Sequence, residues 1–210
     1  MRATRFVMIV LLALLHAGCA TMSQGECLSG NWGRVGYDDG AAGYPSSRLR
    51  NHEQACAAHG VGVDARTYLD AREQGLEVFC TPYRGFTVAS NGQNYAGVCP
   101  AHLERGFLAG FSDGRFVHEA KQHLDSVGSD VSAIEYRIRK ASQDIDKTNK
   151  RLRSAENDDE RNRLQREVRN LRGDIRRADE DLRHAQRRED TARRDFDRVN
   201  RRFAPIYGHW

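Results

Sequence analysis

The stretch LRSAENDDERNRL, residues 152–164, decides the fold, because it separates two charged segments whose apolar residues recur at alternating steps of four and three. One apolar stripe ends at Ala155 and the other begins at Leu164. That gap equals about two and a half helical turns, so a continuous helix would carry the second stripe on its opposite face. The polar residues between the stripes suit a turn followed by a helix cap. We therefore expect an antiparallel two-helix coiled coil over residues 121–203, with its tip near residues 156–160.

Folding the chain back about this tip makes the two stripes meet almost residue for residue. The expected pairs are Leu152 with Leu164, Ile145 with Leu171, Ile138 with Ala178, and Ile134 with Leu182. Only Val127 opposite Glu189 is an unfavourable pair. The return arm would span about 64 Å and end beside Asp113, where residues 204–210 form a C-terminal aromatic tail.

The outer faces of both arms are charged, with acidic residues four positions before basic ones. Such pairs stabilise a helix by about 0.2–0.5 kcal/mol each and are typical of a solvated surface. They are Glu135/Arg139, Asp146/Lys150, Asp159/Arg163, Asp179/Arg183, Asp190/Arg194 and Asp197/Arg201. The acids cancel most of the basic charge, and an exported chain does not meet cytoplasmic nucleic acid, so we expect no nucleic-acid partner. Anionic glycans or lipid headgroups stay open as weak partners.

The N-terminus has the features of an export signal over residues 1–18. Two arginines precede the apolar run FVMIVLLALL, which is too short to span a bilayer. The following Ala17-Gly18-Cys19 resembles a bacterial lipobox, in which the cysteine is lipidated, although His16 stands where an aliphatic residue is usual. The alternative is ordinary cleavage after Ala20, which would give a soluble periplasmic protein. Ala20 itself resembles the residue that sorts lipoproteins to the outer membrane.

Four cysteines remain when Cys19 is set aside, and an even number in an exported chain favours two disulfides. Of the three possible connectivities we prefer Cys27–Cys56 and Cys80–Cys99, each restraining the unfolded chain by about 3 kcal/mol. Covalent cross-links of this kind suit a chain with only 39% hydrophobic residues, which has little apolar surface to bury. The alternative use of Cys56, as a metal ligand with His52 and His59, lacks a fourth ligand and a free thiolate. We therefore expect no metal.

The segment from Cys19 to residue 120, which we call the head, is rich in cysteine and glycine. Glycines on one face of residues 32–43 predict a helix packed closely against another backbone. Further helices are expected over residues 48–59 and 64–74, the latter closed by Gly75. Residues 78–80 and 94–99 look like the arms of a short β-like hairpin, and Pro100 opens a long helix. The similarity of residues 35–40 to 109–114 suggests two helices that cross through glycine grooves.

Polar residues in the head offer one low-specificity candidate site for a small ligand or glycan. The candidates are Asp39, His52, Asp64, Tyr68 and Asp113. The aspartates could supply acid–base chemistry, but no nucleophile motif, phosphate-binding loop or dinucleotide fingerprint accompanies them. We therefore expect no catalytic residue and no cofactor.

The head carries a series of glycine, cysteine, aromatic and polar residues whose order resembles that of a bacterial lipoprotein family, the one catalogued as domain of unknown function 2799. The resemblance covers roughly residues 19–120 and rests on Trp32, Gly36, Asp39-Gly40, Gly43, His52, Cys56, Gly60, Asp64, Tyr68, Gly75-Leu76, Phe79-Cys80, Gly85, Gly92, Tyr95, Gly97-Val98-Cys99-Pro100, Phe107 and Gly110. Ala71 and Phe79 depart from the usual Gly and Tyr. The resemblance implies an envelope lipoprotein without an assigned activity, so no functional residue carries over.

Together these features predict a mainly α protein: a small disulfide-stapled helical head with a short β-like hairpin, followed by the long coiled-coil hairpin. We expect a non-enzymatic protein of the bacterial cell envelope, lipid-anchored to the outer membrane and facing the periplasm. The coiled coil would act as a spacer or docking arm for another envelope protein, and the chain would be a monomer or a coiled-coil dimer. The alternative is a head that binds, or binds and hydrolyses, a small ligand or glycan in the periplasm.

Overall fold

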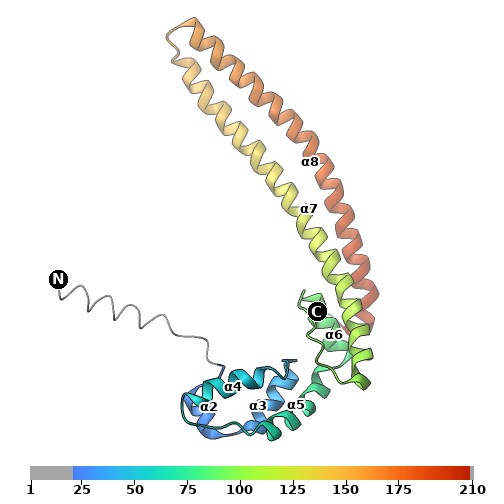
Figure 1. The fold of residues 1–210 in the computed structure, drawn as a ribbon. Helices are drawn as coiled ribbons and strands as arrows, with labels where there is room; N and C mark the ends of the chain where they lie inside the picture. The colour runs from blue at the N-terminus through green and yellow to red at the C-terminus, as the bar shows by residue number, and fades with distance from the viewer. Residues whose placement is uncertain (1–20, 209–210) are drawn as a thin grey trace, which may run out of the picture. The chain divides into compact units, whose positions relative to one another are not determined.

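The computed structural model describes residues 21–208, which divide into two compact units with the boundary between Ser112 and Asp113. The predicted signal segment, Cys19, Ala20 and the last two residues lie outside the described residues. The helices of the described part are α2 (Gln24–Ser29), α3 (Trp32–Ala41), α4 (Arg48–Ala57), α5 (Ala65–Phe79), α6 (Pro82–Ser90), α7 (Ala101–Arg153) and α8 (Asp158–Tyr207) (Figure 1). None of these helices has an apolar stretch long enough to cross a membrane.

Four helices of the N-terminal unit, α2, α3, α5 and α6, begin where a side chain accepts from one of the first free backbone N–H groups, whereas α4 begins without such a bond. Ser23 and Glu26 form a reciprocal capping box at α2. Asp64 accepts from the Thr67 N–H at the start of α5. Thr81 does the same for α6, where Pro82 occupies the first turn. These local rules fix the boundaries of short helices that have little core of their own.

The predicted close approach of a glycine-lined helix is confirmed in the crossing of α3 and α5. A Cβ added to Gly36 would collide with the Tyr68 carbonyl oxygen, and one added to Gly40 would collide with that of Arg72. Gly75 returns the contact from α5 onto the α3 backbone. Gly75 therefore lies inside α5. The prediction that Gly75 closes this helix is wrong.

The two similar glycine segments serve two separate crossings. Gly40 of the first faces α5, whereas Gly110 of the second lies against the Pro82 backbone at the start of α6. Gly85 of α6 in turn approaches the Phe107 carbonyl oxygen. The interpretation that glycine opens grooves for close packing is right, and the repeat marks two such grooves with different partners.

The predicted β-like hairpin is wrong. Val78 and Phe79 are the last residues of α5, residues 82–90 form α6, and residues 94–99 have no regular structure. No strand occurs within residues 21–208. The apolar residues around Cys80 pack as helix ends, because the threonine cap and the following proline start a new helix where a strand turn was expected.

Both preferred disulfides are present, and each lies in its own small core. Cys27–Cys56 is packed with Met22, Trp32 and Tyr68. Cys80–Cys99 lies in a second cluster with Leu76, Phe79 and Phe107. Two small cores of this kind bury little apolar surface, so covalent links contribute a large share of the stability.

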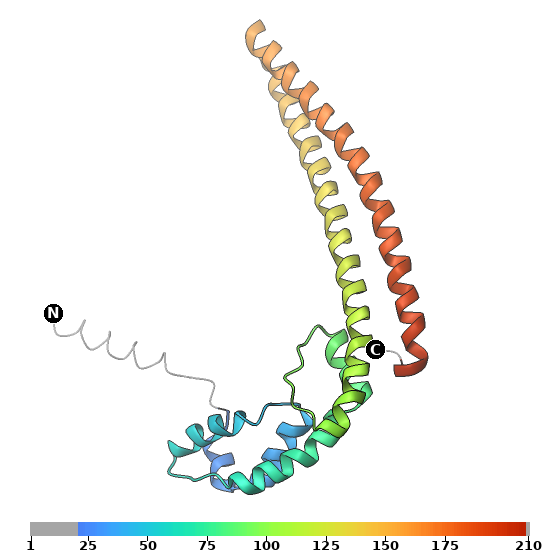
Figure 2. The same cartoon turned by 45° about the vertical axis from the view of Figure 1, so that its right-hand side comes forward.

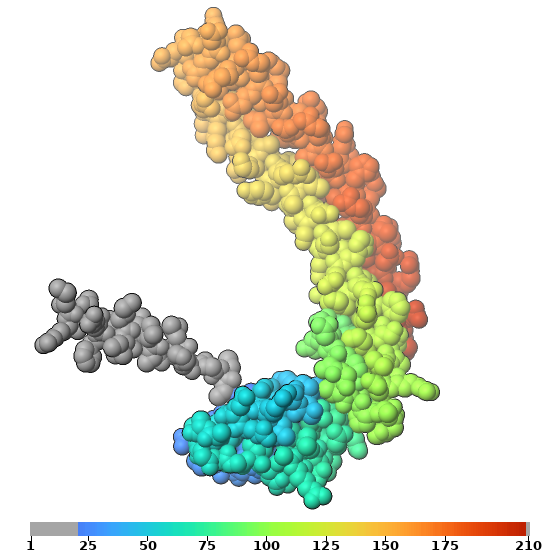
Figure 3. All heavy atoms as spheres, in the orientation of Figure 1, coloured from blue at the N-terminus to red at the C-terminus, as the bar shows by residue number. Residues whose placement is uncertain are grey.

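The C-terminal half is the predicted antiparallel helical hairpin. Val131 and Ile134 of α7 are buried with Ala178 and Ala185 of α8, in the register expected from the sequence. The views in Figures 1 and 2 both show α7 and α8 side by side from the turn. In the space-filling view of Figure 3 their side chains fill the space between them. α7 continues through Gly128 without a break.

At the open end of the hairpin, aromatic residues hold the last turns of α8. Phe203 stacks with Phe116, with ring centroids 6.5 Å apart. The Tyr207 hydroxyl donates to Asp113 Oδ2 at 2.8 Å. α8 therefore ends beside Asp113 as predicted, and residues 204–207 extend the helix where a separate tail was expected.

The charged outer faces differ from the prediction. Of the six expected acid-before-base pairs, only Glu135–Arg139 forms, at 3.7 Å. Arg163 instead pairs with Glu160, at 4.0 Å. Exposed i,i+4 pairs gain too little to hold two long side chains together, so sequence spacing alone does not decide which of them form.

Candidate functional site

The most complete polar cluster of the described residues is centred on Asp39 of α3. His52 Nε2 of α4 lies 2.7 Å from Asp39 Oδ2. The Tyr68 hydroxyl of α5 donates to the same oxygen at 2.7 Å. Three of the five candidate ligand-binding residues therefore converge, one from each of three helices.

One cation and three rings complete the surroundings of the Asp39 carboxylate. Arg48 Nε donates to Asp39 Oδ1 at 3.0 Å. The same guanidinium lies over the Tyr44 ring, 3.9 Å from its centroid. The His52 and Tyr68 rings pack edge to face at 5.8 Å. The carboxylate thus has a cation on one oxygen and two hydrogen bonds on the other.

Burial makes these contacts strong. The His52 side chain is 2% exposed and Tyr68 is fully buried. Loss of solvation, followed by the hydrogen bond to Asp39, raises the pKa of the Tyr68 phenol far above its usual value. Tyr68 therefore stays a neutral donor, and it cannot serve as a base at any ordinary pH.

The second ring nitrogen of His52 connects this cluster to the N-terminal end of the described chain. His52 Nδ1 lies 3.0 Å from Thr21 Oγ1. The next residue, Met22, is buried in the same core as Cys27 and Tyr68. Thr21 lies two positions after Cys19, so the cluster fastens the segment that follows the expected lipidation site.

Every polar atom at the centre of the cluster has a partner. Both Asp39 oxygens accept hydrogen bonds, and both His52 ring nitrogens are engaged. A substrate would have to displace one of these contacts before it could reach the carboxylate or the imidazole. The arrangement therefore joins α3, α4, α5 and the Thr21 segment, as buried networks with all groups satisfied do.

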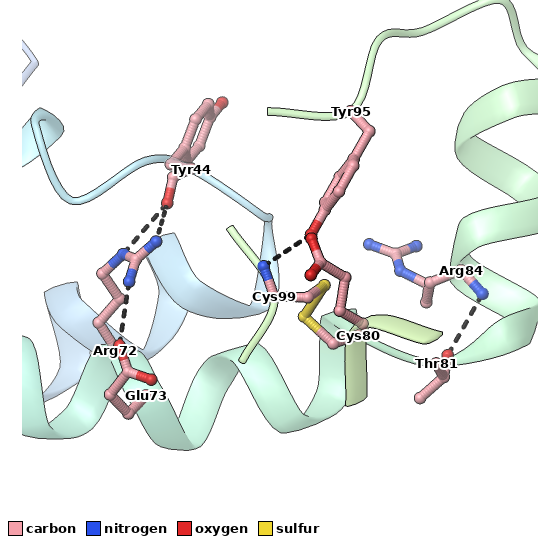
Figure 4. Close-up of a disulfide and its surroundings, with 9 residues drawn as sticks. Tyr44, Arg72, Glu73, Cys80, Thr81, Arg84, Tyr95 and Cys99 are labelled. Carbon is pink, nitrogen blue, oxygen red and sulfur yellow. Dashed lines mark hydrogen bonds and ion pairs between the residues drawn. A yellow bond between two sulfur atoms is a disulfide. The ribbon is translucent and has the colours of Figure 1, made fainter. Parts of the chain in front are cut away.

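A second polar group surrounds the Cys80–Cys99 disulfide (Figure 4). The Tyr95 hydroxyl accepts from the Cys99 N–H at 2.9 Å and donates to Glu104 at 3.0 Å. Burial, opposed by the Cys99 hydrogen bond and reinforced by the one to Glu104, raises the pKa of Tyr95. These contacts order the irregular segment before α7.

Arg72 has a similar structural role nearby. Its Nε and Nη2 both donate to the Tyr44 carbonyl oxygen, at 3.1 and 2.8 Å. Figure 4 shows the guanidinium turned toward this carbonyl. The buried arginine thereby satisfies backbone in the loop after α3 and has no orientation toward an open site.

The other two candidate residues do not join the Asp39 cluster. Asp64 is a helix cap, bonded to both the N–H and the hydroxyl of Thr67. Asp113 belongs to the hairpin unit and accepts from Tyr207. The five-residue site is therefore wrong as a single site.

The alternative metal site of His52, Cys56 and His59 lacks one of its three ligands, because Cys56 is bonded to Cys27. No group of three or more potential ligands forms within the described part of the chain.

Sequence reasoning missed Thr21, Arg48 and Arg72. Arg48 precedes His52 by four residues and Arg72 follows Tyr68 by four, so helical spacing from the recognised residues could have indicated both. Thr21 gave no such signal, because its contact with His52 joins distant parts of the chain.

Residues 31–116 match the model of a family described as "Protein of unknown function (DUF2799)". The resemblance is thereby confirmed for this part of the chain, which includes the Asp39 cluster and the Cys80–Cys99 disulfide but not the hairpin. No curated protein and no solved structure matches the chain.

Proposed function

We propose that this chain is a lipid-anchored protein of the bacterial cell envelope whose hairpin acts as a spacer or docking arm. The family matched by the head assigns no activity, so the proposal rests on the architecture. Its main support is the hairpin: two helices of 53 and 50 residues that pack on each other and present a charged outer surface. A long arm with a narrow apolar seam is suited to reaching a partner.

The disulfides support the proposed compartment. All four cysteines of the described residues are paired, and such bonds persist in oxidising compartments such as the periplasm. The lipobox-like Cys19 supplies the proposed anchor to the outer membrane. The Asp39 cluster would then hold the segment after the anchor against the head, through the contact between His52 and Thr21.

The proposal assigns no catalytic residue and no cofactor. The second candidate, a ligand- or glycan-binding head, draws support from the convergence of Asp39, His52 and Tyr68. Full pairing of those groups weighs against it. If the second candidate is right, His52→Ala in the folded protein should abolish binding of a glycan that the wild type retains.

Photo-crosslinking in the native envelope tests the docking arm. A photoreactive residue replaces Tyr136 of the hairpin, which is 60% exposed, or Tyr83 of the head, which is 55% exposed. The two sites match in residue type and exposure, so they differ only in the unit that carries them. We expect a discrete protein adduct from position 136 and none from position 83. Adducts from position 83 alone would refute a docking role for the arm.

A further inference from the structure

Exposed residues on α8 form a row whose charge changes sign along the helix. Every seventh residue belongs to it, so the members lie along one line of a coiled-coil helix. We call it the charge row: Arg169, Arg176, Arg183, Asp190 and Asp197. All five are exposed. At about 1.5 Å per residue the row spans about 42 Å, with its positive end toward the turn.

The charge row has no ion-pair partner within the described residues. The sequence offers Asp190 an arginine four positions later and Arg183 an aspartate four positions earlier, but neither pair forms. Arg172 and Asp179, which lie beside the row, are also without ion pairs, whereas Arg193, two heptads after Asp179, pairs with Glu189 at 3.1 Å. Charges left unpaired within one chain can be paired by another.

The opposite flank of the hairpin is different. Residues of the charge row directly follow seam residues, whereas three residues of α8 that directly precede seam residues contact α7 on the other side. There Asp181 pairs with Arg137 at 3.8 Å, Arg188 pairs with Asp130 at 3.2 Å, and Glu167 accepts from Thr148 at 3.1 Å. One flank is therefore closed by contacts between the two helices, and the other is open.

The open flank also has a hollow near the point where the charge changes sign. Its volume is about 690 Å³, and its lining includes Asp125, Gly128, Ser132 and Glu189. Gly128 lies at the level of Glu189, its added Cβ meeting only Glu189 Oε1 at 4.0 Å. Gly128, Ser129 and Ser132 are the small residues of this lining, which Leu124, Asp125, Glu189 and Arg193 complete. At Gly128 another chain can approach closely.

We propose that the open flank binds a second copy of this chain, with the two α8 helices antiparallel about a two-fold axis between Arg183 and Asp190. Each Arg183 then faces Asp190 of the other copy, and each Arg176 faces Asp197. A self-complementary patch of this kind is what a two-fold dimer requires. The hollow of each copy lies beside the axis, so the two copies can approach each other closely there. Because the contacts are polar and exposed, the dimer depends strongly on salt.

Sedimentation velocity of the full chain tests the dimer, with Cys19→Ser in every protein to remove the acyl acceptor. The protein with an unchanged charge row should be dimeric in about 0.05 M salt and monomeric in about 0.5 M salt. Arg176→Glu with Arg183→Glu makes all four of the facing positions 176, 183, 190 and 197 acidic, and Asp190→Arg with Asp197→Arg makes all four basic. Each double variant alone should dimerise on the order of tenfold or more weakly. Mixed together, they should form a heterodimer.

The matched control reverses the charge of two arginines of α8 that lie outside the charge row, Arg177→Glu with Arg198→Glu. Each directly follows a residue of the row in the sequence. This control should dimerise like the wild type. If a reversed variant fails to fold, as judged by circular dichroism, Arg176→Gln with Arg183→Gln replaces it and should weaken the dimer in the same direction. A wild type that is monomeric in low salt, or reversed variants that form no heterodimer, would overturn the proposal. A monomer that sediments with anionic vesicles through these arginines would show a membrane-binding face instead.

Discussion

Replacing Asp39 with asparagine tests the buried cluster that joins three helices of the head. The amide keeps the size of the side chain but removes the charge and places N–H donors where an oxygen accepted. Hydrogen bonds to a charged group contribute about 1.5–3 kcal/mol each, and removing one partner of a buried pair costs about 3–5 kcal/mol. Arg48 is 27% exposed, so its contact contributes less than those of His52 and Tyr68. We expect Asp39→Asn to lower the free energy of unfolding by about 3–5 kcal/mol.

Urea unfolding with the disulfides intact measures this loss. Trp32 is 5% exposed and belongs to the same core as Tyr68, so its fluorescence reports on the head when Trp210→Phe removes the second tryptophan. At a typical urea dependence the midpoint should fall by about 2 M.

The control is Asp38→Asn, the same substitution one residue away. Asp38 is 63% exposed and pairs only with Arg34, at 3.5 Å, so its replacement should change the midpoint little. Equal midpoints for the Asp38 and Asp39 variants would refute the assignment of the Asp39 cluster as a stabilising network.

Three other outcomes follow from the packing. Gly40→Ala should destabilise the head by about 1–3 kcal/mol in the same urea assay, because its Cβ would collide with α5, whereas Gly25→Ala, with open space around it, should not. Glu189→Leu should stabilise the hairpin by about 1–2 kcal/mol in thermal unfolding followed by circular dichroism, because it restores an apolar seam residue; an unchanged or lower stability would contradict the seam register. Loss of solvation, followed by the bond to Asp113, raises the pKa of Tyr207 to about 12. The contact should therefore stabilise the hairpin fully below pH 10 and be lost as the pH rises through about 12, a loss that Tyr207→Phe should not show.

The hairpin was predictable from the sequence because its contacts repeat. Each seam residue meets a partner fixed by the mirror about the tip, so one pattern predicted the pairing of Ile134 with Leu182 and the burial around Ala178. The exposed charges were not predictable, since the free-energy differences among alternative surface pairs are only tenths of a kcal/mol.

The head was harder because its contacts are not periodic. Glycine spacing indicated a close helix crossing, but the identity of the partner helix depends on tertiary packing. The short apolar runs near Cys80 fit either a strand or a helix end, and the cap at Thr81 decided between them. Likewise, His52 and Tyr68 stood out as polar residues on helical faces, whereas Thr21 joins them only through the folded chain.

The intact mass of the mature protein extracted from bacterial membranes tests the account most directly. We predict a chain that begins at Cys19, carries a lipid on that residue and has four oxidised cysteines. Cys19→Ser should abolish the lipid mass and release the protein from the membrane fraction. A wild-type chain that begins after Ala20 without a lipid, or one with four free thiols, would contradict the anchored envelope protein proposed here.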